Sequence, residues 1–380
     1  MIIRNGMIHD AVNETPYQAD IAVRDGKIAE IAVNIQALEG EEILDASGLQ
    51  VYPGLVEAHC HLGVRNTGIG DLGIDHNEKT DIMTPHLRAI DAFWPQEPYV
   101  RTSLEAGVTT VCTGPGSANI IGGSFIVTKT HGTSVDKMVL DPCAAMKCAF
   151  GENPKRIYAG KSCNTRMAIA GKMREMLFTA RDYMLRKEAA NGEITKMPKF
   201  DMKCEAMIPV LKGEIPLKAH AHRADDILTA IRIAKEFDVK LTLEHCTEGH
   251  LIVDELVEAG WPVVIGPTFG VNSKHELANK TFETPGILAK AGLCVSITTD
   301  HPVQALGNLP LFAGMAVKYG MDPFAALQAI TINPAKHIGM AHRVGSIEVG
   351  KDGDIVLADG DIMLNTTSVK AVVVNGEKVC

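Results

Sequence analysis

The sequence predicts an α/β fold, namely a (β/α)8 TIM barrel with a small β-sandwich domain formed from both termini. Both ends of the chain consist of short strand-like segments and turns, whereas the middle alternates apolar strands with helical patterns. With 380 residues, 46% of them hydrophobic, the chain can fill a barrel core. We expect residues 1–52 and 345–380 to form the β-sandwich domain and residues 53–344 the barrel.

The two β-rich ends share a pattern of short apolar runs separated by turns. Their strand candidates are residues 1–5, 20–23, 28–33, 42–45, 354–358 and 369–374. Arg24-Asp25-Gly26-Lys27 lies between two of these runs and is typical of a hairpin turn. Because similar ends flank a different middle, one composite domain is the simplest arrangement.

The middle of the chain supplies the elements of a barrel. Its eight strand candidates are Leu55–Ala58, Val108–Cys112, Ser124–Thr128, Ala144–Phe150, Leu217–Ala221, Leu241–Glu244, Pro262–Ile265 and Leu293–Thr298. Helices are predicted at Lys172–Ala190, Asp225–Phe237 and Gly249–Ala259. A doubly wound sheet would also fit, but no G-x-G-x-x-G follows the first strand. In a barrel, the chemistry lies at the carboxyl ends of the strands.

Composition excludes several classes of function. The formal net charge of -9 and pI near 5.9 argue against binding to nucleic acid or to an anionic membrane. No apolar stretch is long enough to span a bilayer, and the start lacks the pattern of a secretory signal. The nine cysteines are scattered without a C-x-x-C pair, which favours reduced thiols and a cytoplasmic protein.

The first barrel strand ends in two histidines, His59 and His61. In an extended strand this spacing points both imidazoles to one side, about 7 Å apart along the chain. Cys60 then faces away from them. Two neutral imidazoles facing one point can bind a borderline metal such as zinc.

Further polar residues end other predicted strands. His220 and His222 end the fifth strand, His245 ends the sixth, and Asp300 ends the eighth. Stability alone does not require ionisable side chains at these strand ends. Because the carboxyl ends of barrel strands meet at one face, these residues predict a shared metal site.

These residues, in this order, resemble the amidohydrolase superfamily of metal-dependent hydrolases. The segments YPGLVEAHCH, beginning at Tyr52, and NPAKHIGMAHRVGSIEVGKDGDIVLAD, beginning at Asn333, agree with it. The resemblance covers essentially the whole chain and is closest to the imidazolonepropionase-like and related amidohydrolase branch. It implies a barrel with a β-sandwich built from both termini, and homo-oligomers.

The resemblance also implies roles for individual residues. His59 and His61 would hold the more buried metal, and His220 and His245 the more exposed one. Asp300 would bind the metal and the hydrolytic water, and would move the proton of that water. One or two divalent ions per chain are implied, with zinc the first expectation. His222 lies two residues beyond His220 and so on the same face, where it would be a substitute ligand or a substrate contact, with an ordinary surface histidine as an equal alternative.

The fourth strand offers two candidate ligands. Family members supply either a carboxylated lysine that bridges two metals or a glutamate that binds one. Lys147 lies in mid-strand, where a buried ammonium is costly unless it is paired or modified, and Glu152 lies just beyond the strand. We favour Glu152 as the ligand and keep Lys147 as the alternative.

Two other residues are candidate substrate contacts. His76 lies in the long loop after the first strand, a usual place for a substrate wall. Arg166 follows the fourth strand and could bind a substrate carboxylate in a bidentate manner, although an ordinary surface or intersubunit ion pair is an equal alternative.

The expected function is hydrolysis of an amide or cyclic-amide C–N bond of a small molecule by metal-bound hydroxide. Alternatives are an aminohydrolase (deaminase) and a dipeptidase of the Xaa-Pro or Xaa-Arg type. The positions after His220 lack the glutamate of the deaminase branch, which weakens that alternative and strict imidazolonepropionase identity. A serine hydrolase is disfavoured because no G-x-S-x-G is present. A non-catalytic scaffold would be expected to have lost some of these residues.

Overall fold

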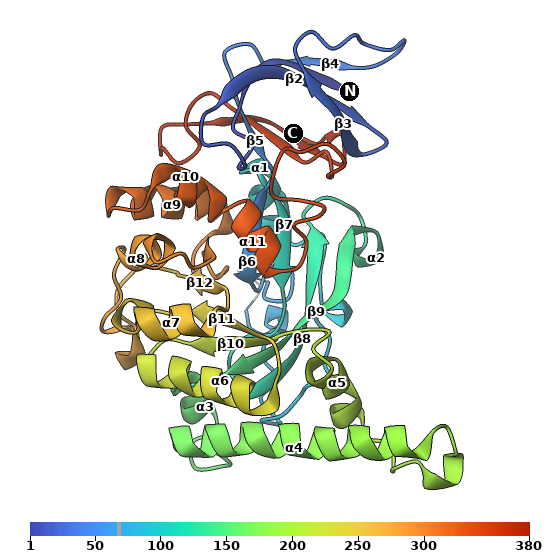
Figure 1. Cartoon of the computed structure of the whole chain (residues 1–380), viewed down its shortest axis with the longest axis vertical. Coiled ribbons are helices and arrows are strands. Elements are labelled where there is room, and N and C mark those ends of the chain that lie inside the picture. Colours follow the sequence, from blue (N-terminus) through green and yellow to red (C-terminus); the bar gives the residue numbers. More distant parts are fainter. Residues whose placement is uncertain (67–69) are drawn as a thin grey trace.

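The structure is a computed structural model that describes residues 1–66 and 70–380. Strands from both ends of the chain form one eight-stranded sheet, in the order β16-β15-β14-β5-β1-β2-β3, with β4 paired to β1. Their bounds are β1 Ile2–Ile8, β2 Tyr17–Arg24, β3 Lys27–Ala32, β4 Ile43–Asp45, β5 Gln50–Pro53, β14 Ile355–Ala358, β15 Val369–Val374 and β16 Glu377–Lys378. Figure 1 shows both termini at this end of the molecule.

The pairing of β14 with β5 joins the two ends of the chain. Ile355 is the partner of Pro53 and Leu357 the partner of Val51 in this antiparallel pair. Ile355, Leu357 and Val51 are fully buried in one cluster, so their apolar contacts hold the termini together. The predicted strands of both ends are thereby confirmed. The two-layered sandwich and the domain limits at 52/53 and 344/345 remain predictions.

A second eight-stranded sheet forms a nearly closed barrel, in the order β13-β12-β11-β10-β9-β8-β7-β6. Its strands are β6 Leu55–Cys60, β7 Val108–Thr113, β8 Ile121–Lys129, β9 Val139–Ala149, β10 Leu217–Ala221, β11 Leu241–His245, β12 Val263–Ile265 and β13 Val295–Ile297. All eight predicted barrel strands are therefore confirmed. Just beyond β13, the Thr298 hydroxyl donates to the carbonyl oxygen of His59 at 2.7 Å, which links the two outer strands.

One strand departs from the regular (β/α)8 pattern. β8 runs antiparallel to both β7 and β9, whereas the other barrel pairs are parallel. The connections 114–120 and 130–138 are shorter than the crossover of about a dozen residues that parallel neighbours need. Consequently the start of β8, rather than its end, lies at the face where the other strands end.

Helices surround the barrel, and α4 lies at the end of the molecule opposite the terminal sheet (Figure 1). Their bounds are α1 Pro98–Glu105, α2 Val135–Met138, α3 Glu152–Ile157, α4 Arg166–Ala190, α5 Met202–Leu211, α6 Ala224–Phe237, α7 Val253–Ala259, α8 Thr284–Lys290, α9 Leu309–Lys318, α10 Pro323–Gln328 and α11 Ile332–His337. The predicted helix from Lys172 begins earlier because the Thr165 side chain caps it by accepting from the Ala168 N–H. None of the helices in the described part of the chain has the length and apolarity to cross a membrane.

Candidate metal centre

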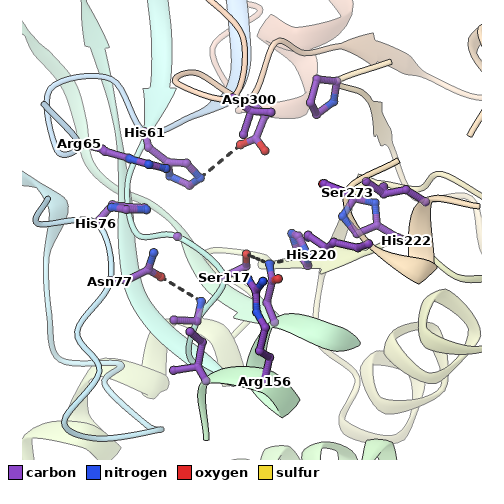
Figure 2. A pocket seen from close by; sticks show the side chains of 18 of the residues that line it. His61, Arg65, His76, Asn77, Ser117, Arg156, His220, His222, Ser273 and Asp300 are labelled. Carbon is purple, nitrogen blue, oxygen red and sulfur yellow. Dashed lines mark hydrogen bonds and ion pairs between the residues drawn. The ribbon is translucent and has the colours of Figure 1, made fainter. Parts of the chain in front are cut away.

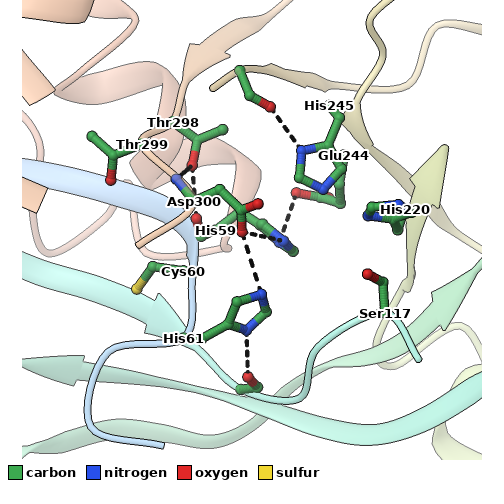
Figure 3. Close-up of polar contacts among 12 residues, drawn as sticks. His59, Cys60, His61, Ser117, His220, Glu244, His245, Thr298, Thr299 and Asp300 are labelled. Atoms are coloured by element: carbon green, nitrogen blue, oxygen red, sulfur yellow. Dashed lines mark hydrogen bonds and ion pairs between the residues drawn. The ribbon is translucent and has the colours of Figure 1, made fainter. Parts of the chain in front are cut away.

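The strand ends bring the predicted ligands to one face of the barrel. His59 lies near the end of β6 and His61 just after it, His220 lies in β10, His245 ends β11, and Asp300 follows β13. Figure 3 shows these side chains directed toward a common centre. All four histidines are buried, with exposed fractions of 7% or less. The sequence thus identified residues that the fold brings together.

Short distances connect the β6 histidines to the end of β13. The Nε2 atom of His61 lies 3.3 Å from Oδ1 of Asp300, and Nε2 of His59 lies 3.7 Å from the same oxygen. Asp300 has a φ of +51° and His245 a φ of +73°, and residues other than glycine rarely adopt these backbone conformations. Such strain at strand ends is typical of functional sites.

Within the part of the chain that the structure describes, the candidate ligands form two groups that share His245. One group contains His59, His245 and Asp300, and the other contains His220, His222 and His245. Within each group, one possible ligand atom per residue lies within 4.8 Å of the others. His222 therefore belongs to the cluster by position, as either of its predicted roles requires.

Hydrogen bonds fix the orientation of the imidazole rings. Nδ1 of His61 lies 2.8 Å from the carbonyl oxygen of Gly114, and Nδ1 of His245 lies 2.7 Å from that of Gly266. A carbonyl oxygen only accepts, so each Nδ1 carries the proton and each Nε2 keeps a free lone pair. Metal-binding histidines have the same arrangement.

The protonation states also suit a cation. Burial lowers the pKa of His59, His220 and His222 well below the ordinary value, so these imidazoles are neutral at pH 7. Burial alone would raise the pKa of Asp300, but its contacts with His61 and the neighbouring imidazoles outweigh burial and hold that pKa well below the usual range. Neutral imidazoles around an ionised carboxylate are a donor set that fits zinc.

The two fourth-strand candidates occupy different places. Lys147 is fully buried in β9, and its Nζ lies 3.3 Å from Nε2 of His59, inside the cluster. Burial lowers the pKa of Lys147 to about 8. Glu152 begins α3, and its Oε1 accepts from the backbone N–H of Glu276 at 2.9 Å. This geometry favours Lys147 over our first choice, Glu152.

A buried charge network behind His59 was not predicted. Oε2 of Glu244 lies 3.2 Å from Nδ1 of His59 and 3.0 Å from Nζ of Lys218. Oε1 of Glu244 lies 3.1 Å from Nε2 of His337. The sequence contained a signal for this network, because Lys218 precedes His220 by two residues and therefore shares its face of β10. Glu244 faces inward as well, since it is the register partner of His220.

A cavity of about 410 Å³ opens beside the cluster (Figure 2). His76 and His222 line it together with His61, His220 and Asp300. The ring centre of His76 lies 5.4 Å from that of His61, which is consistent with its predicted contact with substrate.

Arg166 lies elsewhere, at the start of α4. Its Nε lies 3.0 Å from both carboxylate oxygens of Asp226, and Arg166 is not among the residues that line the cavity. The alternative of an ordinary ion pair therefore describes its present contacts.

Comparison with known proteins places this site in a family. The model of the amidohydrolase family matches residues 50–379. The chain belongs to the amidohydrolase family. Its fold matches the crystal structure of an amidohydrolase from Thermotoga maritima MSB8 with a TM-score of 0.96 and 39% identity, covering 100% of this chain and 99% of that one.

Curated relatives are more distant and longer. The chain is 29% identical to Amidohydrolase tasK of Hapsidospora irregularis over 90% of its own length and 38% of that protein. It is 23% identical to an adenine deaminase of Lactobacillus delbrueckii subsp. bulgaricus over 99% of its length and 58% of that protein. The chain therefore spans about two to three fifths of the length of these relatives.

Proposed function

We propose that the protein is a metal-dependent hydrolase that cleaves a C–N bond in an amide or cyclic amide. The observation that carries this proposal is the convergence of neutral imidazoles from β6, β10 and β11 with the ionised Asp300 at the mouth of a cavity. Family membership supports the reaction class, and the composition of the cluster supports a divalent metal.

The side chains of the cluster are already oriented to bind a metal. The Nε2 atoms of His61 and His245 face the cluster because their Nδ1 atoms are anchored on carbonyls. Oδ1 of Asp300 and Nδ1 of His220 are buried without a hydrogen-bond partner, so each has capacity for one. His59, His61, His220, His245 and Asp300 would hold one or two divalent ions, with zinc as our first expectation.

The fourth-strand position is a second part of this proposal. We place Lys147 there, carboxylated on Nζ, because its Nζ lies beside His59 in the cluster. Glu152 remains the alternative, and the two choices differ in mass. A carboxylated lysine adds the mass of CO2 to the intact chain under non-denaturing conditions.

When bound, a divalent ion would polarise the substrate oxygen and lower the pKa of water toward neutrality. The protein supplies the remaining steps. Asp300 accepts the proton of the attacking water because it is held ionised, and then returns that proton to the leaving nitrogen. His61 Nε2 lies 3.3 Å from Oδ1 of Asp300, so these two residues would hold the same metal. The walls that carry His76 and His222 confine the substrate above these groups.

An aminohydrolase that releases ammonia is the second candidate. Relatives named adenine deaminase support it. The sequence lacks a glutamate directly after His220, but Glu276 from another segment is fully buried nearby. Its Oε1 lies 3.9 Å from His220 Nε2 and 3.8 Å from His222 Nε2. A carboxylate beside this histidine pair could serve the proton transfers of a deamination.

Assays on lactams, hydantoins, N-acyl amino acids, dipeptides and adenine would test the proposal. We expect C–N hydrolysis that Asp300→Asn slows by about 10²–10⁴-fold. Asp254→Asn, an exposed carboxylate on α7, is the matched control and should change nothing. Release of ammonia from adenine would select the aminohydrolase. No hydrolysis with any divalent metal, or full activity of Asp300→Asn, would refute the proposal.

Oligomerisation and a cytoplasmic location stay as proposals that rest on the family resemblance and on composition. The nine cysteines are all free thiols, as a reducing compartment allows. The substrate is a small molecule by the size of the cavity.

A further inference from the structure

The cavity beside the cluster is rich in cationic side chains. Its lining includes Arg65, Lys79, Arg156, Lys274 and Lys280, whereas Asp300 is its acidic lining residue within the described part of the chain. The whole protein carries a formal net charge of -9. The cavity therefore has the opposite charge balance to the molecule around it.

Two of these lysines already have partners. Nζ of Lys274 lies 3.1 Å from Oε1 of Glu276. Nζ of Lys280 donates to the carbonyl oxygen of Gly270 at 2.9 Å. By contrast, the side chains of Arg65, Lys79 and Arg156 make no ion pair or side-chain hydrogen bond with any residue that the structure describes.

The unpaired cations come from separate segments that meet only in the fold. Arg65 follows β6, Lys79 lies farther along the same long connection, and Arg156 lies in α3 after β9. Figure 2 shows Arg65 beside His61 and Arg156 beneath Ser117 and His220. Lys79 and Arg156 are exposed and Arg65 is half-buried, so solvent screens their mutual repulsion, and an anion that enters the cavity would meet the charge of all three.

The rest of the cavity wall indicates the body of the ligand. Ile74, Phe269, Val271, Leu277 and Val303 give it an apolar part. Oδ1 of Asn153 is buried without a hydrogen-bond partner and can accept a hydrogen bond from an amide N–H. The cavity therefore combines a cationic region, an apolar region and a free acceptor.

We propose that the substrate carries a carboxylate on a short apolar body, away from the bond that is cleaved, and that Arg65 and Arg156 bind this carboxylate. This inference rests on the proposed function and names the substrate class of the same site. Arginine suits the task because its planar guanidinium can donate two parallel hydrogen bonds to a carboxylate. Lys79 adds charge at the exposed rim and steers anions inward.

Calorimetric titration of the protein as purified, with its metal, tests the inference. The probes are glutarate and its neutral isostere glutaramide. We expect glutarate to bind at least about tenfold more tightly than glutaramide, and to weaken as salt is raised. Arg65→Gln and Arg156→Gln should each weaken glutarate binding by about tenfold or more. Arg232→Gln, an exposed arginine on α6, is the control and should bind glutarate normally.

Further measurements separate the possible failures. Arg65→Lys keeps the charge and should restore part of the affinity, which a folding defect in Arg65→Gln would not predict. Glutarate binding that is unchanged in both arginine variants would assign the anion to the metal and overturn the inference. Equal affinity for glutarate and glutaramide would overturn it too. In either case, hydrolysis of neutral amides would leave the proposed function intact, whereas arginine-dependent binding without any hydrolysis would contradict the function alone.

Discussion

Replacing Glu244 by glutamine tests how the buried network supports His59. The Glu244 carboxylate is fully buried and contacts His59, Lys218 and His337 at 3.0–3.2 Å. Burial alone would raise the pKa of Glu244, but Lys218 and His337 outweigh burial and hold it well below the usual value. The carboxylate is therefore ionised, and Glu244→Gln removes a charge without changing the shape of the side chain.

The main cost comes from the cation that is left behind. Lys218 is 1% exposed, and among the residues that the structure describes its other polar contact is Nε2 of His337 at 3.4 Å. Removing one partner of a buried ion pair costs about 3–5 kcal/mol. Glutamine still offers an acceptor oxygen, so we expect the lower end, about 3 kcal/mol. Lys218→Met in the same chain removes the orphaned charge and should recover most of that loss.

The same change should weaken metal binding. Glu244 contacts Nδ1 of His59 and keeps the opposite nitrogen directed at the cluster. Loss of such an orienting partner weakens metal affinity by about 10–100-fold, and we expect the lower value because glutamine can still accept. Unlike stability, metal affinity should not recover when Lys218→Met is added.

Urea unfolding gives the stability change, and competition with a chromophoric chelator gives the zinc affinity. Glu236→Gln is the matched control, since Glu236 forms a partly exposed ion pair with Arg174 at 2.7 Å and should have no measurable effect. If Glu244→Gln unfolds at the wild-type urea concentration and binds zinc normally, the network neither stabilises the barrel nor orients His59.

Other changes have equally direct outcomes. Lys129→Met leaves the buried Asp354 without its cation, whereas Asp352 keeps Lys27 and Arg343, so the free energy of unfolding should fall by about 3 kcal/mol in urea titrations. Burial alone would raise the pKa of Asp352, but Lys129 and the other cationic partners of Asp352 lower that pKa. The stabilisation from ionised Asp352 is therefore present above pH 3.8 and lost below it. Measurements of unfolding during acid titration should show this loss, and a loss near pH 6 would contradict the assignment. Gly266→Ala should destabilise the barrel and reduce zinc affinity. The φ of Gly266 is +132°, and the added Cβ would lie 2.3 Å from the Thr298 carbonyl oxygen. An unchanged melting temperature would refute this prediction.

Much of the candidate metal centre could be predicted from the sequence, because its residues lie at the ends of predicted strands. His59 and His245 end apolar runs, and Asp300 closely follows one, so their convergence needed only the rule that barrel strands end at one face. The composite sheet was equally predictable, because short apolar runs at both ends of the chain can bury one another only where the termini meet. Ile355 and Val51 are buried together in this way.

Other features depend on three-dimensional detail that the pattern does not contain. The direction of β8 follows from the lengths of two connections and not from its apolar pattern. The choice between Lys147 and Glu152 depends on where each side chain points, and only the fold shows that Glu152 binds the backbone of Glu276. His337 reaches Glu244 from α11, 93 residues farther along the chain.

Elemental analysis of protein purified without added metal tests the central claim most directly. We expect one or two equivalents of a divalent metal, with zinc foremost, per folded chain. The combined variant His59→Asn and His245→Asn should keep the circular dichroism of the fold but lose that metal. A folded wild-type protein without stoichiometric metal that also fails to take up zinc, or a variant that retains its full metal content, would contradict the account.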